Sequence, residues 1–318
     1  MINAHKPLNN EAFDVVYTWV NHADPNWQKL HAKATKSRLT PKDEHISAND
    51  TARFQNRNEL YWSIRSVRKY APWVRNIYVL TNCSMPEWIK DFDNIYWVDH
   101  EEVFPDHHHL PTFSSHSIET VLHKIPNLSE RFLYFNDDFF LCRSVQPEQF
   151  FWGEQGVYYT LSPHDIPYTR SADNLKPVDT GAINAAAFLE RDYQYKPQKK
   201  LQHTPYVLSC TMLYELEEKY KNSVEYTRNQ TFRQPTDVAM ATTLHAYYAH
   251  CTGRGRPSNI KTRYIDIGDW CFLGLVHPLA PLWRNKYDSL CLNEVETMRY
   301  GAKLRDALVA KLMQKLFQ

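Results

Sequence analysis

The sequence predicts an α/β protein built on a mostly parallel β-sheet that is flanked by helices. Short β-branched and aromatic runs alternate with stretches of helical periodicity, which is the order of parallel strands and their crossover helices. The length of 318 residues and the hydrophobic content of 43% are enough for one large core of this kind.

Four strands and, between the first two of them, a helix are predicted in the first half of the chain. Leu60, Ile64, Val67 and Ala71 recur at helical spacing, and Pro72 ends that run. The strands are apolar runs bounded by polar residues. They lie at residues 14–20 (DVVYTWV), 76–81 (NIYVLT), 94–98 (NIYWV) and 131–135 (RFLYF).

Most of the other predicted elements are helices. Ser114 or Ser115 caps a helix that carries apolar residues on one face. Thr204-Pro205 has the pattern of a helix start, with a cap followed by proline, and we expect that helix to reach Lys219. Further elements are a strand at 157–161 and helices at 184–189, 236–250 and from about 294 to the end.

The C-terminal helix is predicted to be amphipathic. Leucines recur every four residues from Leu304 to Leu316, flanked by lysines and an arginine. We therefore divide the chain into a main α/β domain at 12–292 and a C-terminal amphipathic helix at 293–318. Such a stripe is typical of a core or partner contact, and its lysines also allow contact with the inner face of a membrane.

The balance of charge excludes some classes of partner. Lys and Arg number 37 against 36 Asp and Glu, for a formal net charge of +1, so no overall field attracts nucleic acid or lipid. The six cysteines form no C-x-x-C pair and are interpreted as reduced. Residues 1–11 are polar and no segment approaches a membrane span, so we expect a cytoplasmic protein.

The sequence also lacks the glycine-rich loops that hold phosphates. Only 8 glycines are present, and none forms G-x-x-x-x-G-K or G-x-G-x-x-G. A phosphate bound by this chain must therefore meet arginines, a metal ion or a helix N-terminus.

Asp137 and Asp138 are the most distinctive candidate site. They directly follow a predicted buried strand, and in parallel sheets ligands bind at the carboxyl ends of the strands. Two carboxylates there suit a hard divalent cation such as Mg²⁺, which takes one or two protein carboxylates together with substrate phosphates. The alternative is that one acid caps the next turn and the other is solvated.

Several basic residues are weaker candidates by residue type alone. Arg53 could fork onto a phosphate, whereas Arg65 fits a role near a helix C-terminus or on the surface. His203 is a candidate base or a structural histidine. Arg233 and Asp237 bracket a predicted helix start, where a charge pair is also routine capping.

Three consecutive histidines, His107 to His109, could indicate a metal site. Three neighbours in sequence cannot all converge on one ion, and Pro105 and Pro111 frame them. We expect a solvated loop.

Taken together, the runs resemble the Stealth proteins. DVVYTWV at 14–20, RF at 53–54, NEL at 58–60, SIRS at 63–66 and YAPWVRNI at 70–77 look like the first two conserved regions. LPTFSSH at 110–116, IE at 118–119, FLYFNDD at 132–138, Pro147 and FF at 150–151 look like the third, and HTP at 203–205 and RQPTD at 233–237 like the fourth. The resemblance covers roughly residues 12–250.

The resemblance implies a reaction and a fold. Stealth proteins are sugar-1-phosphate transferases that include bacterial capsule polymerases and the animal enzyme that tags lysosomal glycoproteins. It implies a UDP-hexose or UDP-N-acetylhexosamine donor and a fold similar to the GT-A nucleotide-sugar transferases. An acceptor hydroxyl attacks the β-phosphorus, which gives a phosphodiester and releases UMP.

The resemblance also implies roles for individual residues. Asp137 and Asp138 would hold the metal, Mg²⁺ or Mn²⁺, while Arg53 and Arg233 steady the phosphates and His203 acts as general base. Further expected members of the site are Asp14, Tyr17, Thr18, Trp19, Asn58 and Arg65 on the donor side and Asp237 among the catalytic residues. At Asn21-His22 the sequence departs from the Asn/Asp-Gly turn that is common in relatives, which leaves the shape of the first loop open.

We therefore expect a transferase that acts on a capsule or related surface polysaccharide. Its partners would be a UDP-sugar, the acceptor glycan and, through the C-terminal helix, a capsule-assembly partner or the membrane, with no nucleic acid. One alternative is an ordinary metal-dependent UDP-sugar glycosyltransferase. The other is a non-catalytic carbohydrate-binding protein, which the 9 Trp and 20 Tyr would suit.

Overall fold

The computed structural model describes residues 11–36, 57–171, 175–268, 286–294 and 301–317. Its central sheet has five strands in the order β10-β4-β1-β2-β3. Four of them run parallel to one another, β1 (Phe13–Thr18), β2 (Val74–Thr81), β3 (Ile95–Asp99) and β4 (Arg131–Asn136). The four strands predicted in the first half of the chain are confirmed, and with the flanking helices they confirm the α/β fold class.

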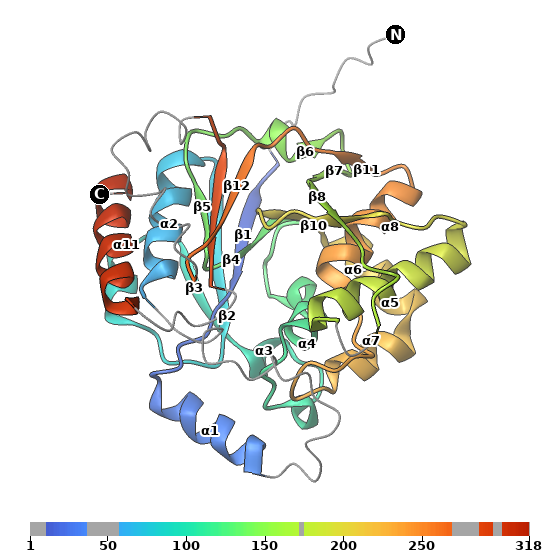
Figure 1. Cartoon of the computed structure of the whole chain (residues 1–318), viewed down its shortest axis with the longest axis horizontal. Helices are drawn as coiled ribbons and strands as arrows, with labels where there is room; N and C mark the ends of the chain where they lie inside the picture. Colours follow the sequence, from blue (N-terminus) through green and yellow to red (C-terminus); the bar gives the residue numbers. More distant parts are fainter. Residues whose placement is uncertain (1–10, 37–56, 172–174, 269–285, 295–300, 318) are drawn as a thin grey trace.

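Helices cover both faces of this sheet (Figure 1). α2 (Glu59–Tyr70) and α11 (Ala302–Phe317) lie together on one side. The other side carries α4 (Ser115–Glu119), α5 (Pro177–Tyr193), α6 (Cys210–Lys219), α7 (Lys221–Arg228) and α8 (His245–Cys251). Burial on both faces explains why the strands read as continuous apolar runs.

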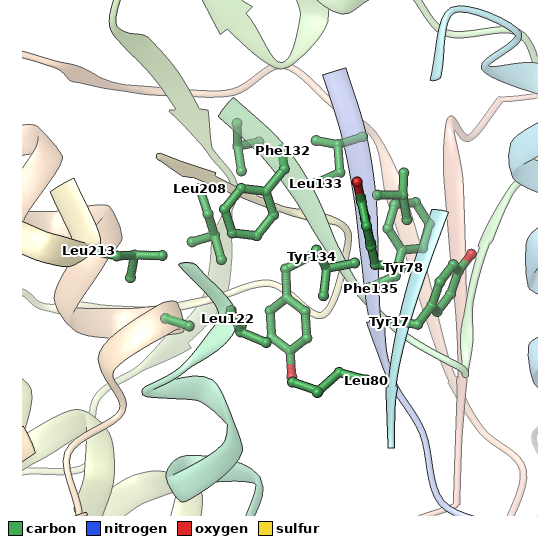
Figure 2. Packing of buried hydrophobic residues seen from close by; sticks show 14 of the residues in the cluster. Tyr17, Tyr78, Leu80, Leu122, Phe132, Leu133, Tyr134, Phe135, Leu208 and Leu213 are labelled. Atoms are coloured by element: carbon green, nitrogen blue, oxygen red, sulfur yellow. The ribbon is translucent and has the colours of Figure 1, made fainter. Parts of the chain in front are cut away.

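The alternation of side chains along β4 shows how the core is divided. Phe132 and Tyr134 point to the side of Leu208 and Leu213, whereas Leu133 and Phe135 point to the opposite side (Figure 2). Side chains along a strand alternate in this way, so each face of β4 contributes to a different layer of the core. None of these residues is more than 1% exposed.

A smaller sheet begins where β4 ends. The chain turns at Asp137-Asp138 and continues as β5 (Phe139–Leu141). β5 is antiparallel to β13 (Ser289–Asn293), which is in turn parallel to β12 (Thr262–Asp266). The two acids therefore occupy the junction between the two sheets.

Short elements complete the described part of the chain. β6 (Phe151–Trp152), β7 (Gly156–Tyr159) and β11 (Gly255–Pro257) form one small sheet, and β8 (Leu161–Asp165) and β9 (Lys199–Leu201) form another. The helical segments are α1 (Pro25–Lys36), α3 (His100–Val103), η4 (Glu87–Asp91), η5 (His107–His109), η6 (Leu122–Lys124), η7 (Pro147–Gln149) and the π-helix η9 (Met240–Leu244).

The helix predicted to start at Thr204-Pro205 is wrong in its first part. Residues after Pro205 form β10 (Tyr206–Ser209), antiparallel to β4, and α6 begins only at Cys210. The side chain of Ser209 is the actual cap and accepts a hydrogen bond from the backbone N–H of Met212. Pairing with the edge of the main sheet outweighs the local cap-proline signal.

Three other predicted helices differ from the structure in extent. The helix capped by Ser114 is broken into α4 and η6, whereas the helix expected at 184–189 is the longer α5. The one expected at 236–250 is divided between η9 and α8.

The apolar face of α11 is occupied within the molecule. Val309, Leu312, Met313, Leu316 and Phe317 are buried in a cluster with residues of β5, β12 and β13. Leu304 alone among the four striped leucines is largely exposed, at 57%. The expected docking of this helix to a partner or membrane is therefore not supported, because the stripe covers the smaller sheet. Among the described residues no helix combines the length and the apolar character needed to cross a bilayer.

Candidate active site

Polar residues gather at the carboxyl ends of the parallel strands. Thr18, the last residue of β1, lies opposite Asn136, the last residue of β4, so the Asp137-Asp138 turn begins at this edge. β10 runs antiparallel to β4 and starts beside it, with Tyr206 opposite Tyr134. The segment that leads into β10 therefore approaches the same edge and brings His203 with it.

β13 fixes the position of Asp138. Its main-chain oxygen accepts a hydrogen bond from the N–H of Leu292 at 3.0 Å. The thiol of Cys291 donates to its Oδ2 at 3.4 Å. The other carboxylate oxygen, Oδ1, is buried and has no hydrogen-bond partner among the described residues, although buried polar atoms are normally satisfied. An unsatisfied oxygen of this kind fits a metal ligand.

The electrostatics of the turn also favour a cation. Burial raises the pKa of Asp138 to about 6, with a further upward contribution from Glu59, while the Cys291 hydrogen bond opposes the shift. Burial, Glu59 and Asp138 hold the pKa of Asp137 well above its usual range. Close carboxylates disfavour each other's ionisation, and a bound cation removes that conflict. The residues present thus fit a divalent metal.

His203 is neutral at physiological pH. Burial lowers the pKa of its ring to about 4, assisted by the positive charges of Lys200 and Arg233. Its ring lies edge-on to Phe139 and Tyr264, with centroid distances of 6.3 and 5.6 Å. Nδ1 is buried and has no partner in the described part of the chain. Nδ1 of this neutral ring is therefore available for a hydrogen bond with a bound group.

A second polar cluster surrounds Arg233. Its guanidinium donates to Oγ of Ser115, while Nε is buried without a partner among the described residues. Glu119 and Asp237 supply negative charge that opposes the lowering of its pKa by burial. Asp237 accepts hydrogen bonds through Oδ2 from Nδ1 of His116 at 3.2 Å and from the N–H of Gln234 at 2.9 Å.

Glu119 is a further candidate site residue that the residue-by-residue reasoning missed. Burial raises the pKa of its carboxyl to about 7, opposed by Arg233 and Tyr134 and reinforced by Asp237. Oε2 of Glu119 and Oδ1 of Asp237 are both buried without partners in the described residues. The available signal was the position of Glu119 at the end of the 110–119 run, but nothing local distinguishes it from a surface acid.

The expected donor-binding residues Tyr17 and Thr18 of β1, and Trp19 directly after it, differ in their surroundings. Thr18 is hydrogen-bonded to the hydroxyl of Tyr134 at 3.0 Å and lies at the site edge. Trp19 packs edge-on against Trp97 and keeps its buried Nε1 without a partner among the described residues. Tyr17 is fully buried and is hydrogen-bonded to Ser63 at 2.8 Å, so its surroundings are those of a core residue.

The expected nucleotide contact of Asp14 is not supported by the geometry. It lies near the amino end of β1, at the opposite end of the strand from Thr18. Its buried carboxylate accepts hydrogen bonds from the Arg75 side chain and from the N–H groups of Asn76 and Ser129. With all of these partners inside the protein, Asp14 has a structural role.

The two remaining described residues that were expected on the donor side lie within α2 and just before it. Nε of Arg65 donates to the main-chain oxygen of Phe317 at 2.9 Å, which ties α2 to the end of α11. Asn58 is an exposed residue that precedes α2 with φ of 65°. The contact of Arg65 does not support its expected donor role, whereas the role of Asn58 stays a prediction. Arg53 lies outside the described residues.

Three family models match the sequence in order. They are described as Stealth protein conserved region 1 at residues 11–38, conserved region 2 at 53–158 and conserved region 3 at 202–250. Together they cover more than half of the chain. The chain belongs to the Stealth protein family. The runs that we assigned to a third region lie in conserved region 2, and those assigned to a fourth lie in conserved region 3, which corrects the numbering but not the order.

Curated Stealth-like relatives carry phosphotransferase names. The chain is 38% identical over 255 residues to an exopolysaccharide phosphotransferase of Streptomyces coelicolor, which covers 80% of this chain and 42% of that protein. It is 35% identical over 260 residues to the capsular polysaccharide phosphotransferase SacB of Neisseria meningitidis serogroup A, covering 81% and 46%. The chain thus spans less than half the length of these two relatives.

Similar solved structures are glycosyltransferases. The bifunctional glycosyltransferase WbbM aligns with a TM-score of 0.46 and 10% identity over 91% of this chain and 47% of its own. The galactosyltransferase LgtC aligns with a TM-score of 0.43 and 12% identity over 96% and 97%.

Proposed function

We propose that this chain is the catalytic part of a sugar-1-phosphate transferase. It moves hexose-1-phosphate or N-acetylhexosamine-1-phosphate from a UDP-sugar to a hydroxyl of a capsule or related surface polysaccharide. Membership of the Stealth family and similarity to capsular and exopolysaccharide phosphotransferases support the class of reaction. The observation that carries the proposal is that an acidic pair, a neutral histidine and an arginine approach one edge of the sheet, each with a buried unpartnered atom or a strongly shifted pKa.

The reaction exchanges one phosphorus–oxygen bond for another. The acceptor hydroxyl attacks the β-phosphorus of the donor, a new O–P bond forms, and the bond from that phosphorus to the bridging oxygen breaks. UMP leaves with the bridging oxygen, and the hydroxyl proton passes to the neutral ring of His203. The product is a phosphodiester.

The reaction also requires that the negative charge of the donor phosphates be neutralised. Phosphoryl transfer depends mainly on positioning and on stabilising charge at the phosphate oxygens. Asp137 and Asp138 would hold Mg²⁺ or Mn²⁺, which supplies positive charge to the donor phosphates. Arg233 adds a fixed positive charge, and Glu119 and Asp237 keep it ionised inside the protein. Arg53 retains its expected role as a second phosphate-binding arginine.

The identity of the released nucleotide tests this reaction. The protein is incubated with a panel of UDP-sugars and an acceptor glycan, with Mg²⁺, with Mn²⁺ and with a chelator. We expect UMP release and a phosphodiester resonance in the phosphorus NMR spectrum of the glycan. Release of UDP would show ordinary glycosyl transfer instead. Glycan binding that persists in Asp138→Asn while no nucleotide is released from the wild type would show a carbohydrate-binding protein.

A further inference from the structure

A group of metal-ligating side chains lies outside the candidate active site. η5 carries His108 and His109, and α7 carries Glu225. One ligand atom from each of these three residues lies within 4.8 Å of the other two. Nε2 of His109 is already 2.7 Å from Oε1 of Glu225.

The expected solvated loop is therefore wrong for one of the three histidines. His109 is only 3% exposed, and its ring packs against Phe104. His107 and His108 are exposed. Two neighbouring histidines approach one carboxylate, and the third does not take part.

Neighbouring groups hold each of the exposed ligands. Asp106 lies 2.6 Å from Nδ1 of His108 and also accepts a hydrogen bond from the N–H of that residue at 3.0 Å. A ring that donates through Nδ1 carries its lone pair on Nε2. Nη1 of Arg228 donates to Oε2 of Glu225 at 3.1 Å, and Arg228 is itself anchored to Thr120. Carboxylates that orient metal-binding histidines in this way are common around metal sites.

We propose that His108, His109 and Glu225 bind a borderline divalent transition metal ion of the Zn²⁺ class. Two imidazole nitrogens and one carboxylate oxygen are ligands that Zn²⁺ accepts, with water in the fourth position. Mg²⁺ prefers oxygen ligands alone, so this site and the Asp137-Asp138 turn select different ions. His109 provides a buried, fixed ligand, while His108 and Glu225 leave an entry path from solvent.

The site connects two segments that support the candidate active site. Ser117 of α4 donates through Oγ to the main-chain oxygen of Arg228 in α7, and the N–H of Phe113 donates to the oxygen of Thr231. A metal ion between η5 and α7 would add a further link across the same junction, next to the segments that carry Glu119 and Arg233. The role of the ion is therefore structural stabilisation of the native state.

The buried residue His109 limits the affinity of the site for the metal ion. For His109 to bind through Nε2 its proton must reside on Nδ1, which is buried and has no partner among the described residues. A missing outer partner of a metal-bound histidine weakens affinity by roughly 10- to 100-fold. The site is accordingly expected to be filled by added metal and not to retain it through purification against a chelator.

Titration of the tag-free full-length protein with ZnCl₂ tests the proposal. Calorimetry should give one Zn²⁺ for this site, and the ion should raise the melting temperature. His108→Ala and Glu225→Gln should each weaken this binding by at least ~10-fold, the effect of losing one metal ligand or its support. His107→Ala is the matched control from the same turn and should bind like the wild type.

Two results would overturn the proposal. One is the absence of Zn²⁺ binding by a wild-type protein that circular dichroism shows to be folded. The other is Zn²⁺ binding with the same affinity in His108→Ala, Glu225→Gln and the wild type, which would place the ion elsewhere. Because the readouts are heat and melting temperature, neither depends on the transferase reaction.

Discussion

The thiol of Cys291 lies 3.4 Å from Oδ2 of Asp138, with the thiol as donor. This contact joins β13 to the turn that follows β4, and the main-chain hydrogen bond from Leu292 to the oxygen of Asp138 strengthens the same junction. One carboxylate oxygen is thereby held by the protein, and the other is left for a ligand.

Replacing Asp138 with Asn should abolish most of the transfer activity. The amide keeps the shape but loses the charge that binds a cation, so we expect a rate at least ~100-fold lower, the scale of one charge-stabilising group. UMP release under saturating donor measures the effect. Glu87→Gln, at a side chain that is 93% exposed, is the control. Near wild-type activity of the Asp138 variant would remove this residue from the reaction.

Replacing His203 with Ala should lower the rate of transfer by a similar factor, for a different reason. Without the neutral ring no general base accepts the proton of the acceptor hydroxyl, and such a base contributes roughly 10²- to 10⁴-fold. The turnover number should fall while the donor KM changes little. His164→Ala changes an exposed histidine of β8 and should leave turnover intact. A loss confined to donor KM would assign His203 to binding.

Shortening a buried side chain on the apolar face of α11 should destabilise the protein. Leu312 is 8% exposed within the cluster that α11 forms with the smaller sheet, so Leu312→Ala should lower the free energy of unfolding by about 2–5 kcal/mol. Leu304→Ala, on the same helix at 57% exposure, should change it by less than ~0.5 kcal/mol. Urea unfolding followed by circular dichroism compares the two. Equal effects would mean that α11 is not packed as described.

Acid should destabilise the protein partly through His100. Burial lowers the pKa of this ring to about 4, below the value of about 6.5 for an exposed histidine. As the pH falls, His100 is therefore protonated in the unfolded state at a higher pH than in the folded state. The free energy of unfolding is unaffected by this group above pH 6.5 and decreases as the pH drops from 6.5 towards 4. The slope for one such group is up to about 1.4 kcal/mol per pH unit.

His100→Leu isolates this contribution. Both ring nitrogens of His100 are buried without partners among the described residues, so an apolar side chain should be tolerated at pH 7. Urea unfolding between pH 7 and pH 5 should show a shallower loss of stability in the variant than in the wild type. Parallel curves would show that His100 does not titrate as its burial implies.

The sequence by itself determined the strands and the acidic turn. A continuous apolar run such as 131–135 can be recognised as a strand from the sequence alone. A strand that is buried on both faces carries apolar residues at every position and not only at every second one. The position of Asp137-Asp138 after such a run placed both acids at a sheet edge in advance. The resemblance of several runs, in a fixed order, indicated the family, which the family models confirm.

Only the tertiary structure decided the surroundings of those acids. Cys291 lies 153 residues from Asp138 in the chain, and Glu119 gains its raised pKa from burial among Arg233, Tyr134 and Asp237. The pattern Thr204-Pro205 favoured a helix locally, but pairing of β10 with β4 made it the entrance to a strand. Burial and strand pairing depend on residues remote in sequence, so local patterns carry no record of them. Asp137 and Asp138 were thus visible in the sequence, whereas their orientation and altered acidity arose from folding.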